Sequence, residues 1–309
     1  MTRNPKPWRM ALPALAFLVF AAGWSGFWYW SFTQAQAHIT DWRAGLAAKG
    51  INITCENESW SGYPFRVEAR CSPGLVEKDG ESVSFGKLTV MAQAYNLGHV
   101  LAVNDADTIF TSRNGQYRFT HEGAIASLIL SRHGHAQADL EFTNLQAEGF
   151  LAQSVGLHAR TRGQVMELAF SLEGGKAQTQ SFSASLTGAL QPVPEGMSLQ
   201  AIAEAGSTFM IEQAVLALGP AQFTGSGTAR VLADGTPEGR LGGRITNLQG
   251  LLDALFDQGL LAAEKRQAAG LLLGLMGAGN PEGMKIDLLA SEGWAWIGPV
   301  RISPLPPLF

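Results

Sequence analysis

One long apolar run opens the chain, and shorter alternating segments follow it. Met10–Phe32 carries no charged side chain, and Arg3, Lys6 and Arg9 come just before it. A bilayer core is about 30 Å thick, and a helix of about 20 apolar residues crosses it. Positively charged flanks stay in the cytoplasm. The pattern therefore predicts one transmembrane anchor, with a cytoplasmic N-terminus and the rest of the chain on the other side.

A cleaved signal peptide is the alternative to an anchor. Ala35-Gln36-Ala37 has the form of a cleavage site, but the apolar core of a signal peptide has only about 7–15 residues. The run also ends in aromatic residues that are typical of the membrane–water interface. These residues are Trp24, Phe27, Trp28, Tyr29, Trp30 and Phe32. We expect an uncleaved signal anchor over residues 1–32, with cleavage after Ala37 as the alternative.

The segment after the anchor, residues 33–50, has the spacing of an amphipathic linker helix. Ala35, Ile39, Trp42 and Leu46 recur on one helical face, and Gly50 is a natural stop. This apolar stripe is expected to pack on the core of the following domain. Packing on the membrane surface is the alternative.

Residues 51–309 are predicted to form a β-rich domain. Alternating apolar and polar runs are separated by turn pairs at residues 79–80, 114–115, 174–175 and 234–235. Asn114-Gly115 is the strongest signal, because both residues suit the positive φ angles of a type I′ turn. We expect a mainly β (α+β) fold with a few helices, in which an antiparallel meander forms a sandwich or an open groove.

A short repeat suggests two related halves in this domain, residues 51–190 and 191–309. The sequence Thr-Asn-Leu-Gln occurs at 143–146 and again at 246–249. Upstream, Phe119-Thr120 before Gly123 resembles Phe223-Thr224 before Gly227. Duplication is the hypothesis, and chance identity of four residues is the alternative.

A helical pattern follows the second copy of the repeat. Residues 262–276 are predicted to form a helix with an apolar end, which is too short to span a bilayer. The apolar residues there include Leu271, Leu272, Leu275 and Met276. The helix is expected to pack on a sheet, and a lid over an apolar groove is the sharper alternative.

Composition favours a β-rich body after the anchor. Charged residues make up only 16% of the chain, and glycine is abundant at 36 residues. The formal net charge is −4, and three basic residues belong to the N-terminal flank. The body is therefore acidic, which argues against nucleic acid as a partner.

The two cysteines, Cys55 and Cys71, are predicted to form a disulfide. Both follow the anchor, in a compartment where disulfides persist. They flank a predicted hairpin, and a register that opposes Trp60 and Arg66 would bring them face to face. Two free buried thiols are the alternative.

Catalytic signatures are absent from the sequence. It contains no nucleophile elbow, Walker loop, dinucleotide-binding glycine motif or paired-cysteine metal motif. His133 and His135, with His121 nearby, could hold a metal, but they lack a further ligand at a recognisable spacing. A polar turn is the better interpretation, and we expect no enzyme activity, cofactor or metal.

The run Trp60-Ser61-Gly62-Tyr63-Pro64-Phe65-Arg66, after an anchor and a helix, resembles the opening of a bacterial envelope family known as domain of unknown function 2125. The ending from Gly293 to Leu308 resembles its C-terminus, and Tyr63 departs from the expected Phe. The family is similar in outline to AsmA-like proteins. That resemblance implies an inner-membrane anchor, a periplasmic β-rich body and a role with phospholipid in envelope maintenance. Within the motif, Phe65 is expected to anchor the turn in the core, and Arg66 to pair with Glu56 or Glu58.

Two functions follow as expectations. The first is a periplasmic protein, anchored in the bacterial inner membrane, that binds or shields lipid in an apolar β-groove. The second is a membrane-anchored interaction or assembly factor without a ligand. A continuous apolar sheet face would favour the first, and a packed sandwich with a polar surface the second.

Overall fold

The computed structural model describes residues 7–112, 115–130, 136–177, 180–194, 198–247, 249–250, 253, 283–297 and 300–309. Over these residues the protein is mostly β, with antiparallel strands in open sheets. The chain divides into unit 1, residues 1–118, and unit 2, residues 119–309. Residue 190, where the two related halves were expected to meet, lies near the end of a strand, Gln180–Gln191, that pairs with the strands before and after it.

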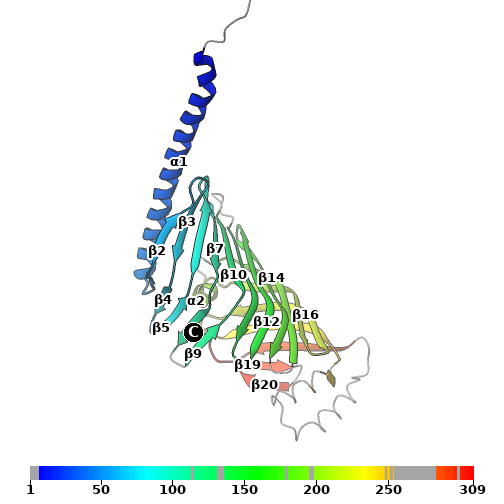
Figure 1. The fold of residues 1–309 in the computed structure, drawn as a ribbon. Coiled ribbons are helices and arrows are strands. Elements are labelled where there is room, and N and C mark those ends of the chain that lie inside the picture. Colours follow the sequence, from blue (N-terminus) through cyan, green and yellow to red (C-terminus); the bar gives the residue numbers. More distant parts are fainter. Residues whose placement is uncertain are drawn as a thin grey trace, which may run out of the picture. The chain divides into compact units, whose positions relative to one another are not determined.

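Unit 1 begins with one long helix, α1 (Pro7–Ala47). The predicted anchor and linker helix are therefore continuous, and Gly50 follows with a φ of 75°. The N-terminal half of α1 projects beyond the sheets of unit 1, whereas the C-terminal half lies along them (Figure 1). Ala35, Ile39 and Leu46 lie on the packed side as expected. Trp42 does not lie on the packed side, since its side chain faces solvent and is 57% exposed.

Two small sheets complete unit 1. The first has the order β1-β4-β5-β8-β9, and within unit 1 the second has the order β2-β3-β6-β7. The strands of the first are β1 (Asn52–Cys55), β4 (Gly74–Lys78), β5 (Glu81–Phe85), β8 (Thr108–Ser112) and β9 (Gly115–Phe119). Those of the second are β2 (Glu58–Ser61), β3 (Arg66–Cys71), β6 (Leu88–Gln93) and β7 (Asn96–Asn104).

The predicted disulfide is present, but the register from which it was predicted is wrong. Cys55 and Cys71 are bonded, with their Cα atoms 5.6 Å apart. Trp60 opposes Ala69 rather than Arg66, and Cys55 lies on β1 instead of the β2–β3 hairpin. The chain bends between β1 and β2 and sends them into different sheets. The disulfide therefore links the two sheets of unit 1.

Unit 2 is a meander of long strands, and each strand is paired antiparallel with the next. Its strands are β10 (Gly123–Leu130), β11 (Ala136–Ala147), β12 (Phe150–Arg162), β13 (Val165–Ala177), β14 (Gln180–Gln191), β15 (Thr208–Leu218), β16 (Ala221–Val231), β17 (Pro237–Thr246), β18 (Met284–Ser291), β19 (Trp294–Ile297) and β20 (Val300–Pro304). A short helix, α2 (Leu199–Glu204), lies between β14 and β15.

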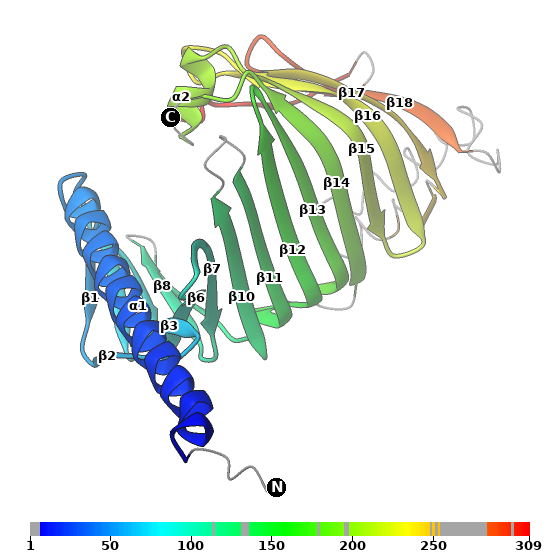
Figure 2. The same cartoon turned by 90° about the horizontal axis from the view of Figure 1, so that it is seen from above.

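The sheet of unit 2 is strongly curved (Figure 2). Register shifts lie at Leu172/Gly175, Thr187/Gly188 and Ile211/Ala214, and bulges of this kind bend and twist strands. The turn expected at Gly174-Gly175 is therefore wrong. Both glycines lie within β13, and Gly174 has a φ of 58°. A glycine inside a strand often marks a bulge, and the register of β13 with β14 shifts at this point.

Two of the other turn predictions are confirmed. Asp79-Gly80 and Asp234-Gly235 lie between paired strands, and all four strands are present. The strands that flank residues 114–115 are also present, although Asn114 lies outside the described residues. The predicted helix at residues 262–276, and His133 and His135, lie outside them as well.

The asparagines of the two repeat copies share a backbone conformation. Asn144 and Asn247 each follow a residue paired with the preceding strand, and both have a φ near 50°. The upstream similarity does not match in register, because Thr143 pairs with Gly123 but Thr246 pairs with Gln222. The two copies therefore share a left-handed turn position, and duplication of larger halves stays a prediction.

Candidate functional site

The two faces of the unit 2 sheet differ sharply in chemistry. Directly opposed residues of an antiparallel pair point to the same face, and successive residues alternate between faces. Three successive rows of opposed residues can be followed from β10 to β18, and every residue in them is apolar.

The rows follow from the strand registers. The first is Ala124, Phe142, Val155, Leu172, Ala184, Leu216, Phe223, Ile245 and Met284. The second is Ala126, Leu140, Leu157, Phe170, Leu186, Ala214, Gly225, Gly243 and Ile286. The third is Leu128, Ala138, Ala159, Leu168, Gly188, Ile211, Gly227, Leu241 and Leu288. We call this surface the apolar face.

Packing on the apolar face is uneven. Ala214, Phe223 and Ile245 are buried and form a small core with neighbouring aliphatic side chains. Leu157 and Leu216, in the rows that cross the middle of the strands, remain 45% and 48% exposed. Exposed leucines within a continuous apolar surface are typical of binding sites for other apolar groups.

A cavity of about 650 Å³ lies on the apolar face at the α2 end of the strands. Its floor includes Met166, Leu190, Phe209 and Leu241, and its walls include side chains of α2, β19 and the C-terminal tail. The wall residues are Leu199, Ile202, Ala295, Trp296 and Leu308. Cavities of this size and apolar lining are typical of sites for small apolar ligands.

Local hydrogen bonds hold α2 in this position. The Ser198 hydroxyl accepts a hydrogen bond from Ala201 N at 3.0 Å and caps the helix. At the other end, the buried Ser207 hydroxyl donates to the Pro192 carbonyl at 2.7 Å. These bonds fix both ends of the segment that carries Leu199 and Ile202 over the cavity.

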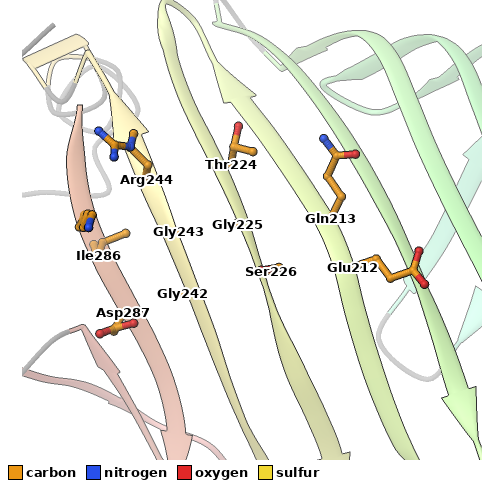
Figure 3. A pocket seen from close by; sticks show the side chains of 11 residues that line it. Glu212, Gln213, Thr224, Gly225, Ser226, Gly242, Gly243, Arg244, Ile286 and Asp287 are labelled. Carbon is orange, nitrogen blue, oxygen red and sulfur yellow. The ribbon is translucent and has the colours of Figure 1, made fainter. Parts of the chain in front are cut away.

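The opposite face of the sheet is polar. A shallow depression of about 690 Å³ lies over Gly225, Ser226, Gly242 and Gly243, where small residues leave space between longer side chains. Figure 3 shows Glu212 and Gln213 on one side of this depression and Arg244 on the other. Glu212 and Gln213 lie at the Ile211/Ala214 register shift. Acidic and basic groups alternate around the depression, so it has no single charge to attract a ligand.

The polar face also carries a hydrogen-bonded Asp–His pair. His158 Nδ1 lies 2.8 Å from Asp139 Oδ1, and Gln137 donates to the same carboxylate. The hydrogen bond from His158 lowers the pKa of Asp139 below its ordinary value of 3.8. Ser171 is on the neighbouring strand β13, but no hydrogen bond joins it to His158 among the described side chains. The pair is therefore fixed in place on the polar face by hydrogen bonds.

Of the three histidines considered as metal ligands, His121 lies in the described part of the chain. Over that part of the chain, no group of three or more His, Cys, Asp or Glu side chains could hold a metal ion. His121 contacts Phe142 edge to face at 5.9 Å.

The motif Trp60–Arg66 forms the turn between β2 and β3, where it lies against α1. Phe65 is not in the core, because its ring contacts Trp24 of α1 at 5.9 Å and stays 64% exposed. Arg66 pairs with Glu68 at 3.2 Å rather than with Glu56 or Glu58. Gly62 has a φ of 114°, and a Cβ there would lie 2.5 Å from the Arg66 carbonyl oxygen. The motif is therefore a helix-docking turn.

The candidate lid residues Leu271, Leu272, Leu275 and Met276 lie outside the described residues, so the lid stays a prediction. Sequence reasoning missed the α2 end of the cavity. Leu199 and Ile202 are helix-spaced, but six residues are too few for a periodicity to be recognised.

Comparison with known proteins gives the family. The model for "Uncharacterized protein conserved in bacteria (DUF2125)" matches residues 28–306. The chain belongs to this family. No curated protein and no solved structure matches it, so the similarity of this DUF2125 protein to AsmA-like proteins stays a prediction. Its helix over Ala11–Ala47 is long and apolar enough to cross a membrane.

Proposed function

We propose that this protein is held on the bacterial inner membrane by α1 and binds the acyl chains of lipid on the apolar face of unit 2. The observation that carries the proposal is the register, which gathers three unbroken apolar rows across nine strands. In a protein without a ligand, other parts of the chain could cover this face. Leu157 and Leu216 are nevertheless exposed there.

The cavity at α2 suits an acyl chain better than a polar ligand. Its lining is almost entirely apolar, and each CH₂ buried there would contribute about 0.8 kcal/mol. The charged residues at its edge are already paired: Arg230 with Glu238, and Arg240 with Asp287 at 3.0 Å. A lipid headgroup would therefore remain in water while its chain lies on the sheet.

The proposed location rests on the N-terminus and the cysteines. Arg3, Lys6 and Arg9 favour a cytoplasmic N-terminus, and a periplasmic location of both units follows from that orientation. The Cys55–Cys71 disulfide is consistent with that oxidising compartment. We propose a binding role and not a catalytic one, since the sequence carries none of the catalytic motifs considered above.

An assembly factor is the second candidate, and the same exposed leucines favour it. In that case the apolar face is covered by another protein, and no lipid is needed. The two proposals differ in what co-purifies with the protein after extraction from the membrane: lipid in the first, and a protein partner without lipid in the second.

Native mass spectrometry of the detergent-extracted full chain, followed by lipid extraction, tests the proposal. We expect bound phospholipid in the wild type and less of it in Ala229→Phe, which fills the cavity. Thr224→Phe places the same ring on the polar face of the same strand and should leave lipid unchanged. A wild-type protein that carries no lipid, and accepts none from liposomes, would favour the assembly factor.

A further inference from the structure

Two turns at one end of unit 1 carry aromatic side chains that are more than half exposed. Tyr63 and Phe65 lie on the β2–β3 turn, and Tyr95 lies on the β6–β7 turn; they are 58%, 64% and 61% exposed. Ala94 N donates to the Phe65 carbonyl at 2.9 Å, so the turns are joined. We call Tyr63, Phe65 and Tyr95 the aromatic tip.

The aromatic tip is fixed to α1 by hydrogen bonds and ring contacts. Trp24 Nε1 donates to the Pro64 carbonyl and Trp28 Nε1 to the Arg66 carbonyl, each at 2.8 Å. The hydroxyls of Ser25 and Tyr63 are 2.9 Å apart. The height of the tip along α1 is therefore set by residues Trp24 to Trp28.

This height coincides with the expected membrane boundary. A hydrocarbon core of about 30 Å takes about 20 helical residues, so a core that begins at Met10 ends near Tyr29. At about 1.5 Å per residue, Trp24 lies about 8 Å inside that end. Interfacial elements bury their apolar side to a depth of about 5–10 Å.

The backbone of the β2–β3 turn is suited to an apolar medium. An unsatisfied carbonyl in lipid costs several kcal/mol. The carbonyls of residues 62, 64, 65 and 66 all accept hydrogen bonds, from Arg66 N, Trp24, Ala94 N and Trp28 respectively. Pro64 has no N–H to satisfy. A turn that faced only water would not need two indole donors for its carbonyls.

We propose that the aromatic tip inserts into the interface of the membrane that α1 crosses, on its periplasmic side. The occupant of this surface is the lipid bilayer itself. Tyr63 and Tyr95 suit that layer because a tyrosine has an apolar ring and a polar end. Arg66 adds an exposed guanidinium at the same height, which can meet lipid phosphate. This inference rests on α1 as a membrane anchor, but not on lipid binding by unit 2.

Photo-crosslinking of the full chain in phosphatidylglycerol–phosphatidylethanolamine vesicles tests the insertion. The photoreactive residue benzoylphenylalanine replaces one aromatic residue at a time: Phe65, Tyr95, Phe20 as the reference in α1, and Tyr117 as the control on β9. Phe20 and Tyr117 are 69% and 47% exposed. We expect lipid adducts at Phe65 and Tyr95 in a yield similar to that at Phe20 and several-fold above that at Tyr117.

The outcomes distinguish a failure of the proposed tip insertion from a failure of the membrane anchor. Adducts at Phe20 with only the Tyr117 level at Phe65 and Tyr95 would overturn the proposed insertion and leave the anchor intact. Loss of adducts at Phe20 as well would refute the anchor, and the inference with it. Trp28→Phe removes one carbonyl donor and should lower the yield at Phe65 but not at Phe20.

Discussion

Reduction of the Cys55–Cys71 disulfide is expected to destabilise unit 1 by about 3 kcal/mol. The cysteines are 16 residues apart, and loop-closure entropy for a loop of that length gives about 3 kcal/mol at 25 °C. The bond also joins the sheet of β1 to that of β3, so its loss frees the two sheets from a direct link.

Urea denaturation of the detergent-solubilised full chain, with and without reductant, measures this effect. For a slope of about 1–3 kcal/mol per M, the midpoint of unit 1 should fall by about 1–3 M. The double variant Cys55→Ser, Cys71→Ser should show the lower midpoint and no response to reductant. Two thiols that titrate in the denatured, unreduced wild type would refute the bond, and equal midpoints would refute the loop-entropy argument.

Further predictions concern packing, pH and topology. Gly227→Ala should destabilise unit 2 by about 1–3 kcal/mol, because its Cβ would clash with the backbone carbonyl oxygen of Arg240 on β17; Gly242→Ala, which meets only a side-chain oxygen at 3.1 Å, should cost less in thermal melts. The depressed pKa of Asp139 stabilises the fold above its unfolded value of about 3.8, and that contribution is lost as pH falls through the lower folded pKa. The urea midpoint should therefore drop more in the wild type than in Asp139→Asn between pH 7 and pH 3, and an equal drop would contradict the assignment. Alkaline phosphatase fused after Phe309 should be active and a cytoplasm-only fluorescent reporter dark, whereas bright fluorescence would reverse the orientation.

Local chemistry was enough to predict the elements that depend on neighbouring residues. The apolar run at Met10–Phe32 lies in a helix, and Asp79-Gly80 forms a two-residue turn between paired strands. Gly174-Gly175 shows the limit of this reasoning. A glycine pair suits a turn and a bulge equally well, and only the pairing of β13 with β14 decides between them.

The site depended on contacts between distant residues. Cys55 and Cys71 are bonded, but not through the hairpin register that was assumed. That register is wrong because β1, which carries Cys55, pairs with β4 in another sheet. Phe65 was expected in a core, but its position is set by Trp24, far away in the sequence. The apolar face could not be predicted from any single strand, because its rows appear only when the eight registers that join nine strands are combined.

Photo-labelling with a phospholipid that carries a diazirine in its acyl chain tests the central proposal most directly. The full chain is labelled in vesicles, and adducts are located by peptide mass spectrometry. If unit 2 binds acyl chains as proposed, labels will appear on residues of the apolar face, such as Leu157 and Leu216, and around the cavity at Phe209. Labels confined to α1 and the aromatic tip, with none on the apolar face, would contradict it.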